Sequence, residues 1–331
     1  MMTASQFLLV LLDPDNYIQI GWGVMAFLTL LVYFFCWLLR RHRWWWLVLT
    51  MPLLLGWYVF LWGTYVGFSQ LEVVRIEFAS KDLPKEFDGY KIVQFSDAHV
   101  GTYTGSRQTI LRRAIDSINA QHADMVVFTG DMQNVVPDEI LPHQALLSSI
   151  KAKDGVFSVL GNHDYAMYLK TNDAIEIGRN EGMARSLQTE MGWTLLINDH
   201  RRIRRDSASI VIAGMENDGE PGGRFPQKGV LNSALYGVNR SEFVVMLEHD
   251  PTAWRRKILP HSHVQLTLSG HTHGGQISVL GLSAASFMYK EPGGMYYVGP
   301  RALYVSKGLG GVIPIRFGAT PEIAVITLRC K

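Results

Sequence analysis

The chain has 331 residues, of which 48% are hydrophobic and only 18% are charged, and its formal net charge is +2. The near-neutral balance gives no support for a surface that binds nucleic acid. The length exceeds one average domain and allows a small membrane part followed by one large globular part.

Two apolar stretches open the chain. Residues 17–39 and 44–71 contain no charged side chain, and each exceeds the roughly 20 residues that cross about 30 Å of hydrocarbon. They predict two transmembrane helices rather than a buried hairpin, because buried helices rarely run this long without a polar residue. A cleaved signal peptide is disfavoured, since nothing basic precedes Arg40. We expect a membrane anchor over residues 1–70 and a globular domain over residues 71–331.

The segment between the two predicted helices carries an orientation signal. It reads RRHRWWW over residues 40–46. Short loops rich in Arg and Lys are retained in the cytoplasm, and Trp rings favour the membrane interface. The charges that precede the first helix are Asp13 and Asp15, so nothing basic opposes an outward N-terminus. With two crossings, we expect the domain after Leu71 to lie outside the cytoplasm.

After Leu71 short apolar runs alternate with helical patterns. The span from residue 106 to 121 has a helical apolar face, with Ser106 as a candidate N-cap, and the face consists of Ile110, Leu111, Ala114, Ile115 and Ile118. Such alternation predicts a layered α/β domain. Six runs rich in β-branched or aromatic residues each precede a polar cluster and predict strands: YKIVQFSD, ADMVVFTGD, GVFSVLGNHD, SIVIAGMEND, EFVVMLEHD and VQLTLSGHTH.

The polar clusters follow the carboxyl ends of these predicted strands, where open α/β sheets place their ligand sites. Each cluster is a weak signal by itself, but together and in this order they predict one site. Spacings of the D-x-H and H-x-H type place both side chains on one face of an extended chain. Mixed nitrogen and oxygen donors suit Mn, Fe, Zn or Co better than calcium. The clusters are DAH at 97–99, GD at 130–131, GNHD at 161–164, His249 and GHTH at 270–273.

The motifs SDAHVG, GD, GNHDY, EHDP and SGHTHGGQI resemble those of the calcineurin-like metallophosphoesterases, over about residues 73–328. They look closest to the membrane-associated bacterial phosphodiesterases with a GHTHGGQ motif. The resemblance implies an α/β fold, a four-layer sandwich of two mixed β-sheets flanked by helices, here preceded by two transmembrane helices. It also implies two divalent metal ions, with manganese the first candidate. One ion falls to Asp97, His99 and His273, the other to Asn162, His249 and His271, and Asp131 bridges them.

The resemblance further implies in-line attack on phosphorus by a metal-bound hydroxide. It assigns His163 to contacting the phosphoryl oxygen or protonating the leaving group. The sequence departs from the family at Asn134, where relatives often carry an Asp that holds the catalytic histidine. An amide can orient an imidazole but cannot stabilise its cation as a carboxylate does. Asp164 is an alternative orienting carboxylate.

Other stretches leave alternatives open. His261 and His263 have H-x-H spacing, but they precede a strand, which favours an ordinary surface turn over a metal site. The basic run 200–205 indicates a solvated face near a turn, or a lipid headgroup site. Residues 276–289, QISVLGLSAASFMY, are unusually apolar beside a metal site and either pack or meet the acyl part of a substrate. The two cysteines, Cys36 and Cys330, are not expected to pair.

These features favour a membrane-anchored phosphoesterase that hydrolyses a phosphodiester or diphosphate of a lipid or envelope substrate, with no nucleic-acid partner. A UDP-diacylglucosamine-type lipid A precursor is an alternative substrate, but it demands a cytoplasmic catalytic face and conflicts with the predicted orientation. A binding protein that has lost catalysis is disfavoured by the complete ligand set. A protein phosphatase of the same fold is a third alternative.

Overall fold

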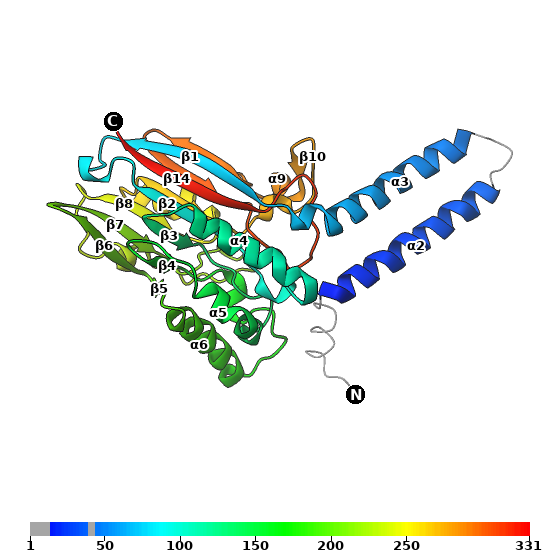
Figure 1. Ribbon diagram of the computed structural model, residues 1–331, viewed down its shortest axis with the longest axis horizontal. Helices are drawn as coiled ribbons and strands as arrows, with labels where there is room; N and C mark the ends of the chain where they lie inside the picture. The colour runs from blue at the N-terminus through cyan, green and yellow to red at the C-terminus, as the bar shows by residue number, and fades with distance from the viewer. Residues whose placement is uncertain (1–13, 39–43) are drawn as a thin grey trace.

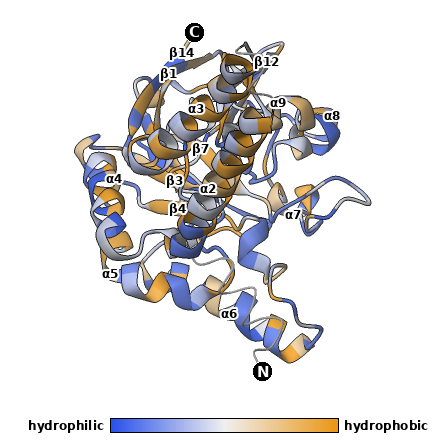
Figure 2. Ribbon diagram, turned by 90° about the vertical axis from the view of Figure 1, so that its right-hand side faces the viewer, coloured by the Kyte–Doolittle hydropathy of each residue, from blue (hydrophilic) through white to orange (hydrophobic). Residues whose placement is uncertain are grey.

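The computed structural model describes residues 14–38 and 44–331, which form a pair of long helices and a layered domain (Figure 1). The helices are α2 (Pro14–Leu38) and α3 (Trp44–Tyr65), which run antiparallel and project from one side of the domain. The segments Asp15–Leu38 and Trp46–Ser69 are long and apolar enough to cross a membrane (Figure 2), and only 6% of the most apolar part of each is buried. The two predicted apolar helices are therefore present, and the domain does not cover them.

The two helices pack on each other and on the domain through few groups. The Trp22 ring lies 5.2 Å from that of Trp57 and 5.9 Å from that of Phe60, measured between centroids. Asp15 lies in the first turn of α2, not ahead of the helix as predicted, and its Oδ1 is 2.9 Å from Nη2 of Arg107. Asp13 and residues 40–43 lie outside the described residues, so the predicted membrane orientation stays a prediction.

Two six-stranded mixed sheets form the centre of the domain. In the first sheet only the β14–β2 pair is antiparallel, and in the second only the two outer pairs are. The first sheet has the order β1 (Glu72–Ser80), β14 (Glu322–Cys330), β2 (Lys91–Phe95), β3 (Met125–Phe128), β4 (Val156–Ser158) and β5 (Thr194–Leu195). The second has the order β12 (Gly294–Val298), β13 (Arg301–Val305), β9 (Leu266–Ser269), β8 (Phe243–Leu247), β7 (Ala208–Gly214) and β6 (Asp199–Arg205).

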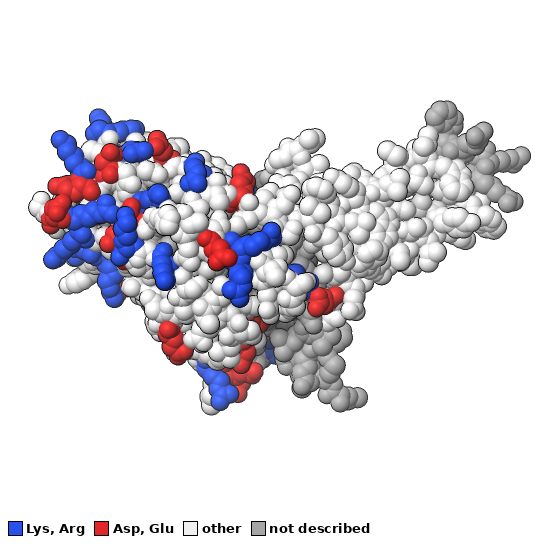
Figure 3. Space-filling model, viewed as in Figure 1, with Lys and Arg blue, Asp and Glu red and all other residues white. Residues whose placement is uncertain are grey.

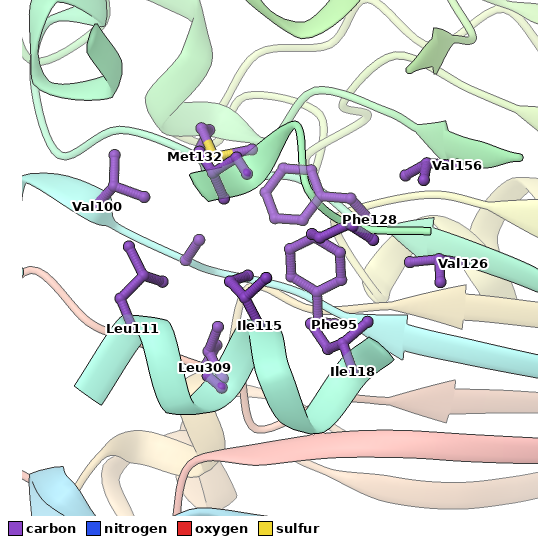
Figure 4. Close-up of a cluster of buried hydrophobic side chains, with 14 of the residues drawn as sticks. Phe95, Val100, Leu111, Ile115, Ile118, Val126, Phe128, Met132, Val156 and Leu309 are labelled. Carbon is purple, nitrogen blue, oxygen red and sulfur yellow. The ribbon is translucent and has the colours of Figure 1, made fainter. Parts of the chain in front are cut away.

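Apolar side chains join the sheets to each other and to outer helices. Ile92 of β2 faces the second sheet, whereas its neighbours Val93 and Phe95 face the helices, as the two-residue period of a strand requires. Figure 4 shows the rings of Phe95 and Phe128 next to each other, close to the side chains of Ile115 and Ile118. The layers are therefore helix, sheet, sheet and helix, as predicted. The helices over the first sheet are α4 (Gln108–Ala120), α5 (Gln144–Leu147) and α6 (Ala174–Glu190), and those over the second are α7 (Leu231–Ala234), η7 (Trp254–Ile258) and α8 (Leu259–His261).

Short elements connect these layers. A small hairpin of β10 (Ser278–Val279) and β11 (Leu282–Ser283) leads into α9 (Ala284–Met288) beside the domain end of α3 (Figure 1). The 3₁₀ elements are η1 (Gly67–Ser69), η2 (Lys85–Phe87), η3 (Val100–Thr102), η4 (Gly105–Arg107), η5 (Pro137–His143), η6 (Asn162–Tyr165) and η8 (His273–Gly275).

The predicted α4 is present, with one error at its start. Its predicted face is confirmed, since Leu111, Ile115 and Ile118 are buried against the first sheet. The helix begins at Gln108, however, and Ser106 lies in the preceding turn η4 without capping it. A separate turn before the helix displaces the cap from Ser106 to Arg107, by one residue, and apolar periodicity cannot show such a turn.

The basic run 200–205 forms most of strand β6 at the edge of the second sheet and ends directly before the turn at Asp206 and Ser207, so it lies near a turn as predicted. Its charges are partly neutralised, since Nε of Arg202 lies 2.7 Å from Glu242 and Nη2 of Arg205 lies 2.7 Å from Asp124. Charged side chains on an edge strand hinder pairing with other chains. This role accounts for the run without a lipid headgroup.

Candidate metal centre

The predicted ligands meet where five strands from both sheets end. Strand β2 is followed by Asp97 and His99, β3 by Asp131, and β4 by Asn162 and His163. From the second sheet, β8 leads to His249 and β9 to His271 and His273. The sixth predicted strand, β7, ends in Glu216, Asn217 and Asp218, which belong to neither described donor cluster.

The donor atoms form two clusters that share one carboxylate. Asp97, His99, Asp131 and His273 make the first, and Asp131, His249 and His271 make the second; within each, the donor atoms lie within 4.8 Å of one another. Oδ2 of Asp131 lies 3.7 Å from Nε2 of His99 and 3.2 Å from Nε2 of His249. Asp131 therefore stands between the clusters, where a bridging ligand would lie.

Hydrogen bonds fix which ring nitrogen points inward. Nδ1 of His99 lies 3.2 Å from the carbonyl oxygen of Gln133, and Nδ1 of His249 lies 2.7 Å from that of Thr129. Both rings then present Nε2 to the cluster. In His271 the roles are reversed, because the Tyr289 hydroxyl lies 2.9 Å from Nε2 and leaves Nδ1 facing His249. Such outer hydrogen bonds set the tautomer of a histidine that ligates a metal.

The backbone is strained at the ligands themselves. Five ligand residues have positive φ angles, a region that side chains disfavour and that costs roughly 1–3 kcal/mol per residue. Gly130, at φ +96°, precedes Asp131, and a Cβ there would lie 2.5 Å from the nitrogen of Gly161. Only glycine fits this junction. The strained ligand residues are Asp97 (φ 50°), His99 (φ 45°), Asp131 (φ 62°), His271 (φ 76°) and His273 (φ 53°).

The donors fit divalent cations. The buried Oδ1 of Asn162 has no hydrogen-bond partner among the residues that the structure describes, although its Nδ2 donates to the Tyr168 hydroxyl at 3.2 Å. A buried polar atom without a partner is costly, and a cation would satisfy it. Mixed imidazole, carboxylate and amide donors match Mn, Fe, Zn or Co. Asn162 was predicted as a ligand of the second ion and lies beside that cluster, since the amide of neighbouring His163 donates to Oδ1 of Asp131 at 2.8 Å.

Burial and mutual charge set the protonation of the site. Burial raises the pKa of Asp97 to about 6, and it lowers the pKa of His99 to about 3 and that of His271 to about 4. Burial alone would lower the pKa of His249 as well. The negative charge of the neighbouring Asp131 carboxylate has the larger effect and raises the pKa of this imidazole. Without metal, His249 therefore keeps a proton beside Asp131 while the other two imidazoles are neutral.

His163 is oriented differently from the prediction. Its Nδ1 lies 2.6 Å from the backbone carbonyl oxygen of Asn134, whereas the Asn134 side chain donates to Oγ1 of Thr102 at 3.0 Å. The amide therefore does not orient the imidazole. The contact to His163 uses a backbone carbonyl, which any residue at position 134 would supply. It is therefore unaffected by the presence of Asn where relatives often carry Asp.

Asp164 does not replace the missing carboxylate. Its oxygens accept hydrogen bonds from the backbone amides of Gly161, Asp131 and Met132 at 2.9, 3.0 and 3.0 Å. It ties the end of β4 to the end of β3, and burial raises its pKa to about 7. Asp164 was predicted as an alternative carboxylate that orients His163. In the described contacts it instead holds two strand ends together.

Other residues at the site carry no motif. The Tyr168 ring stacks on His163 with centroids 4.0 Å apart, and the Arg224 guanidinium lies 5.1 Å from the centre of the Tyr168 ring. The buried Arg316 donates to the carbonyl oxygen of His273 at 2.9 Å. Tyr168 follows Asn162 in the same loop, but Arg224 and Arg316 come from other loops, so no spacing in the sequence links these two arginines to the ligands.

A pocket of about 300 Å³ opens onto the centre. Asp131, Asn162 and His163 line one side of it, and Ala285 and Met288 of α9 line another. The other H-x-H pair, His261 and His263, borders a separate cavity near α7 and α8. It belongs to neither described donor cluster.

Comparison with known proteins decides the family. The model of the family described as calcineurin-like phosphoesterase matches residues 90–275, more than half of the chain. The chain belongs to the calcineurin-like phosphoesterase family. This calcineurin-like phosphoesterase is 34% identical over 280 residues to the uncharacterized metallophosphoesterase YkuE of Bacillus subtilis, which covers 81% of this chain and 89% of that protein. The family is one of metal-dependent phosphoric ester hydrolases, and the predicted enzyme class is confirmed.

Two further relatives are named for a membrane or a substrate. A transmembrane protein with metallophosphoesterase domain of Danio rerio is 30% identical over 78% of this calcineurin-like phosphoesterase, which spans 57% of that longer protein. The UDP-2,3-diacylglucosamine pyrophosphatase LpxG of Chlamydia muridarum is 26% identical, over 82% of this chain and 92% of that protein. The two apolar helices and these relatives support membrane association.

Proposed function

We propose that the chain is a membrane-anchored phosphoesterase with two divalent ions, which hydrolyses a phosphodiester or diphosphate of a lipid or envelope molecule. Residues 1–70 form the anchor and residues 71–331 the catalytic domain. The observation that carries the proposal is the sharing of Asp131 between two donor clusters at one pocket. One ion is held by Asp97, His99 and His273, the other by Asn162, His249 and His271, with Asp131 between them.

The ions, with Mn as the first candidate, supply Lewis acidity, an activated water and a clamp for the phosphoryl oxygens. The chain's own residues hold and orient the reactants. Burial lowers the pKa of His163, so its imidazole is neutral before substrate binds, with Nδ1–H donated to Asn134. A phosphoryl group beside Nε2 raises the pKa of the ring, because a negative charge favours the imidazolium. The ring then takes up a second proton from solvent at Nε2, and it can hand that proton to the leaving oxygen and return to the neutral form.

The substrate is the finer part of the proposal. The LpxG relative supports a UDP-diacylglucosamine-type diphosphate, and that substrate requires the domain to face the cytoplasm. A basic loop retained in the cytoplasm favours the opposite side and hence an envelope phosphodiester or glycerophospholipid. The diphosphate and the glycerophospholipid both carry a phosphoryl group on a molecule with an apolar tail.

Hydrolysis assays test this function. The purified full chain in detergent, loaded with Mn²⁺, is expected to hydrolyse a chromogenic phosphodiester, and the metal-free chain is not. A binding protein without catalysis would show no turnover with Mn, Fe, Zn or Co. A protein phosphatase would prefer a phosphopeptide monoester to the diester. Lipid extracts, with the released products identified by mass, would then define the natural substrate.

A further inference from the structure

Residues 277–288, here called the apolar arm, stand out from the domain surface. They contain β10, β11 and α9, and no charged side chain occurs between residues 274 and 289. Leu280 is 100% exposed, Phe287 81% and Met288 73%. The arm forms an uncharged shoulder in Figure 3, whereas Lys and Arg side chains gather at the far end of the domain. The alternative that this stretch simply packs is therefore wrong for its most apolar side chains.

The tip of the apolar arm places a leucine where both the backbone conformation and the exposure are unfavourable for it. Leu280 and Gly281 have φ angles of 52° and 81°, as in a tight hairpin turn that normally takes Asn-Gly or Asp-Gly. A leucine in the left-handed region is disfavoured, because its Cβ lies too close to the following carbonyl oxygen. Its side chain also gains no packing, since it is fully exposed. A residue that is unfavourable both in conformation and in exposure marks a functional position.

Hydrogen bonds fasten the apolar arm to the loop of residues 313–318. The amide of Ser278 donates to the Phe317 carbonyl at 2.6 Å, and the amide of Phe317 donates to the Gln276 carbonyl at 2.9 Å. The Gln276 side chain donates to the Ile313 carbonyl at 2.9 Å. The arm and this loop therefore form one unit.

The same loop rests on α3 within the apolar span. The amide of Arg316 donates to the Gly63 carbonyl at 3.0 Å, and the Phe317 ring packs on the Tyr58 ring with centroids 5.8 Å apart. Both helix residues belong to the candidate membrane span Trp46–Ser69. Tyr58 lies about 10 Å along the helix axis from the end of α3. The loop therefore lies at a level that the bilayer would reach.

The other side of the apolar arm borders the metal centre. Ala284, Ala285 and Met288 line the same pocket as Asn162 and His163. Tyr289, directly after α9, contacts His271 at 2.9 Å. An apolar wall thus runs from the exposed tip to the ligands.

We propose that the apolar arm inserts into the bilayer leaflet that holds the domain end of α3, so that the metal centre takes a phosphoester lipid directly from that leaflet. Exposed Leu and Phe side chains without charges are typical of elements that lie in the membrane interface. The substrate's apolar tail stays along the arm while its phosphoester reaches the ligands. Insertion of the arm into the bilayer does not depend on the proposed function. Delivery of a lipid substrate to the metal centre does rest on it.

Fluorescence quenching tests the insertion. In a full chain with Cys36 and Cys330 replaced by serine, Leu280→Cys and Phe287→Cys are labelled with an environment-sensitive fluorophore and reconstituted in phosphatidylethanolamine and phosphatidylglycerol vesicles. We expect a blue shift and strong quenching by lipids with a spin label on the acyl chain. The matched control is Ile175→Cys, which is 82% exposed on α6 and should show neither. Equal, weak quenching at all positions would overturn the insertion, and so would crosslinked dimers through Leu280→Cys.

Rates on two substrates test the delivery. The double variant Leu280→Ser and Phe287→Ser should lower hydrolysis of a lipid phosphodiester in vesicles by about tenfold relative to hydrolysis of a soluble diester, because two large apolar side chains no longer enter the lipid. Ile175→Ser should leave this ratio unchanged. An unchanged ratio in the double variant would overturn the delivery. If the unaltered chain hydrolyses neither substrate, the proposed function fails, while the quenching result still decides the insertion.

Discussion

At the scale of single residues, Asp131 has the most exacting place, because both donor clusters use its carboxylate. We predict that Asp131→Asn removes nearly all turnover and lowers the metal content, since an amide cannot bridge two cations as a carboxylate does. Elemental analysis and diester hydrolysis would check this. Two metals per chain with activity retained would contradict it.

His163→Ala is the matched comparison for Asp131→Asn. His163 lies beside the clusters without belonging to either, so the variant should keep its metal. Loss of a group that transfers a proton should slow turnover by roughly 10² to 10⁴. Metal loss equal to that of Asp131→Asn would instead make His163 a ligand.

Asn134 changes its expected role once the contacts are known. The sequence suggests that its amide orients His163 and that an Asp there would move the pH optimum. Because the backbone carbonyl makes this contact, we now predict that Asn134→Ala leaves the pH profile of turnover unchanged and costs only the stability of the bond to Thr102. A shifted pH optimum in Asn134→Ala would restore the side chain to the mechanism.

The proton shared by His249 and Asp131 predicts how metal binding depends on pH. Asp131 raises the pKa of His249 above the ordinary value of 6.5, so the metal-free centre holds a proton that a cation must displace. Metal affinity should therefore rise with pH by up to about tenfold per unit at pH values below the raised pKa and level off above it. In the metal-free protein, the stability from this pair is fully present below pH 6.5 and is lost as pH rises through the raised pKa. Chelator competition at several pH values would measure the effect, and a flat affinity would refute it.

At the scale of elements, the junction of α3 and the domain depends on Gly67, whose backbone lies close to that of Arg316. A Cβ on Gly67 would lie 1.8 Å from the carbonyl oxygen of Arg316, whereas one on Gly23 of α2 would meet nothing within 4 Å. Gly67→Ala should therefore destabilise the full chain by roughly 1–3 kcal/mol and weaken metal binding through Arg316, which contacts His273. Gly23→Ala should do neither. Thermal unfolding in detergent and metal titration of both variants would decide, and equal behaviour would show that the junction yields.

The same scale shows which features were predictable. Apolar runs before Asp97, Asp131 and His249 predicted the strands and their meeting point, because strand periodicity and strand ends are local properties. The contact of Arg316 with His273 was not, since it depends on how a distant loop folds over the centre. The positive φ angles at the ligands were hidden as well, because the surrounding structure imposes them against local preference.

At the scale of the whole molecule, the opposed ends of the structure make the membrane orientation testable. The C-terminus lies at the end of the domain far from α2 and α3, so a reporter fused after Lys331 should not disturb the anchor (Figure 1). If the basic loop 40–46 stays in the cytoplasm, the metal centre faces outward. Alkaline phosphatase fused after Lys331 should then be active. Green fluorescent protein fused at the same position and exported by the same route should be dark.

Replacing Arg40, Arg41 and Arg43 together by neutral residues is the companion experiment. Because charge retention acts through Arg and Lys in short loops, the variant should lose its orientation signal and show mixed topology with both reporters. The reverse reporter pattern in the unaltered chain, with phosphatase silent and fluorescence bright, would place the catalytic domain in the cytoplasm. The apolar arm would then meet the inner leaflet, and a UDP-diacylglucosamine-type diphosphate would become the first substrate to assay in place of an envelope phosphodiester.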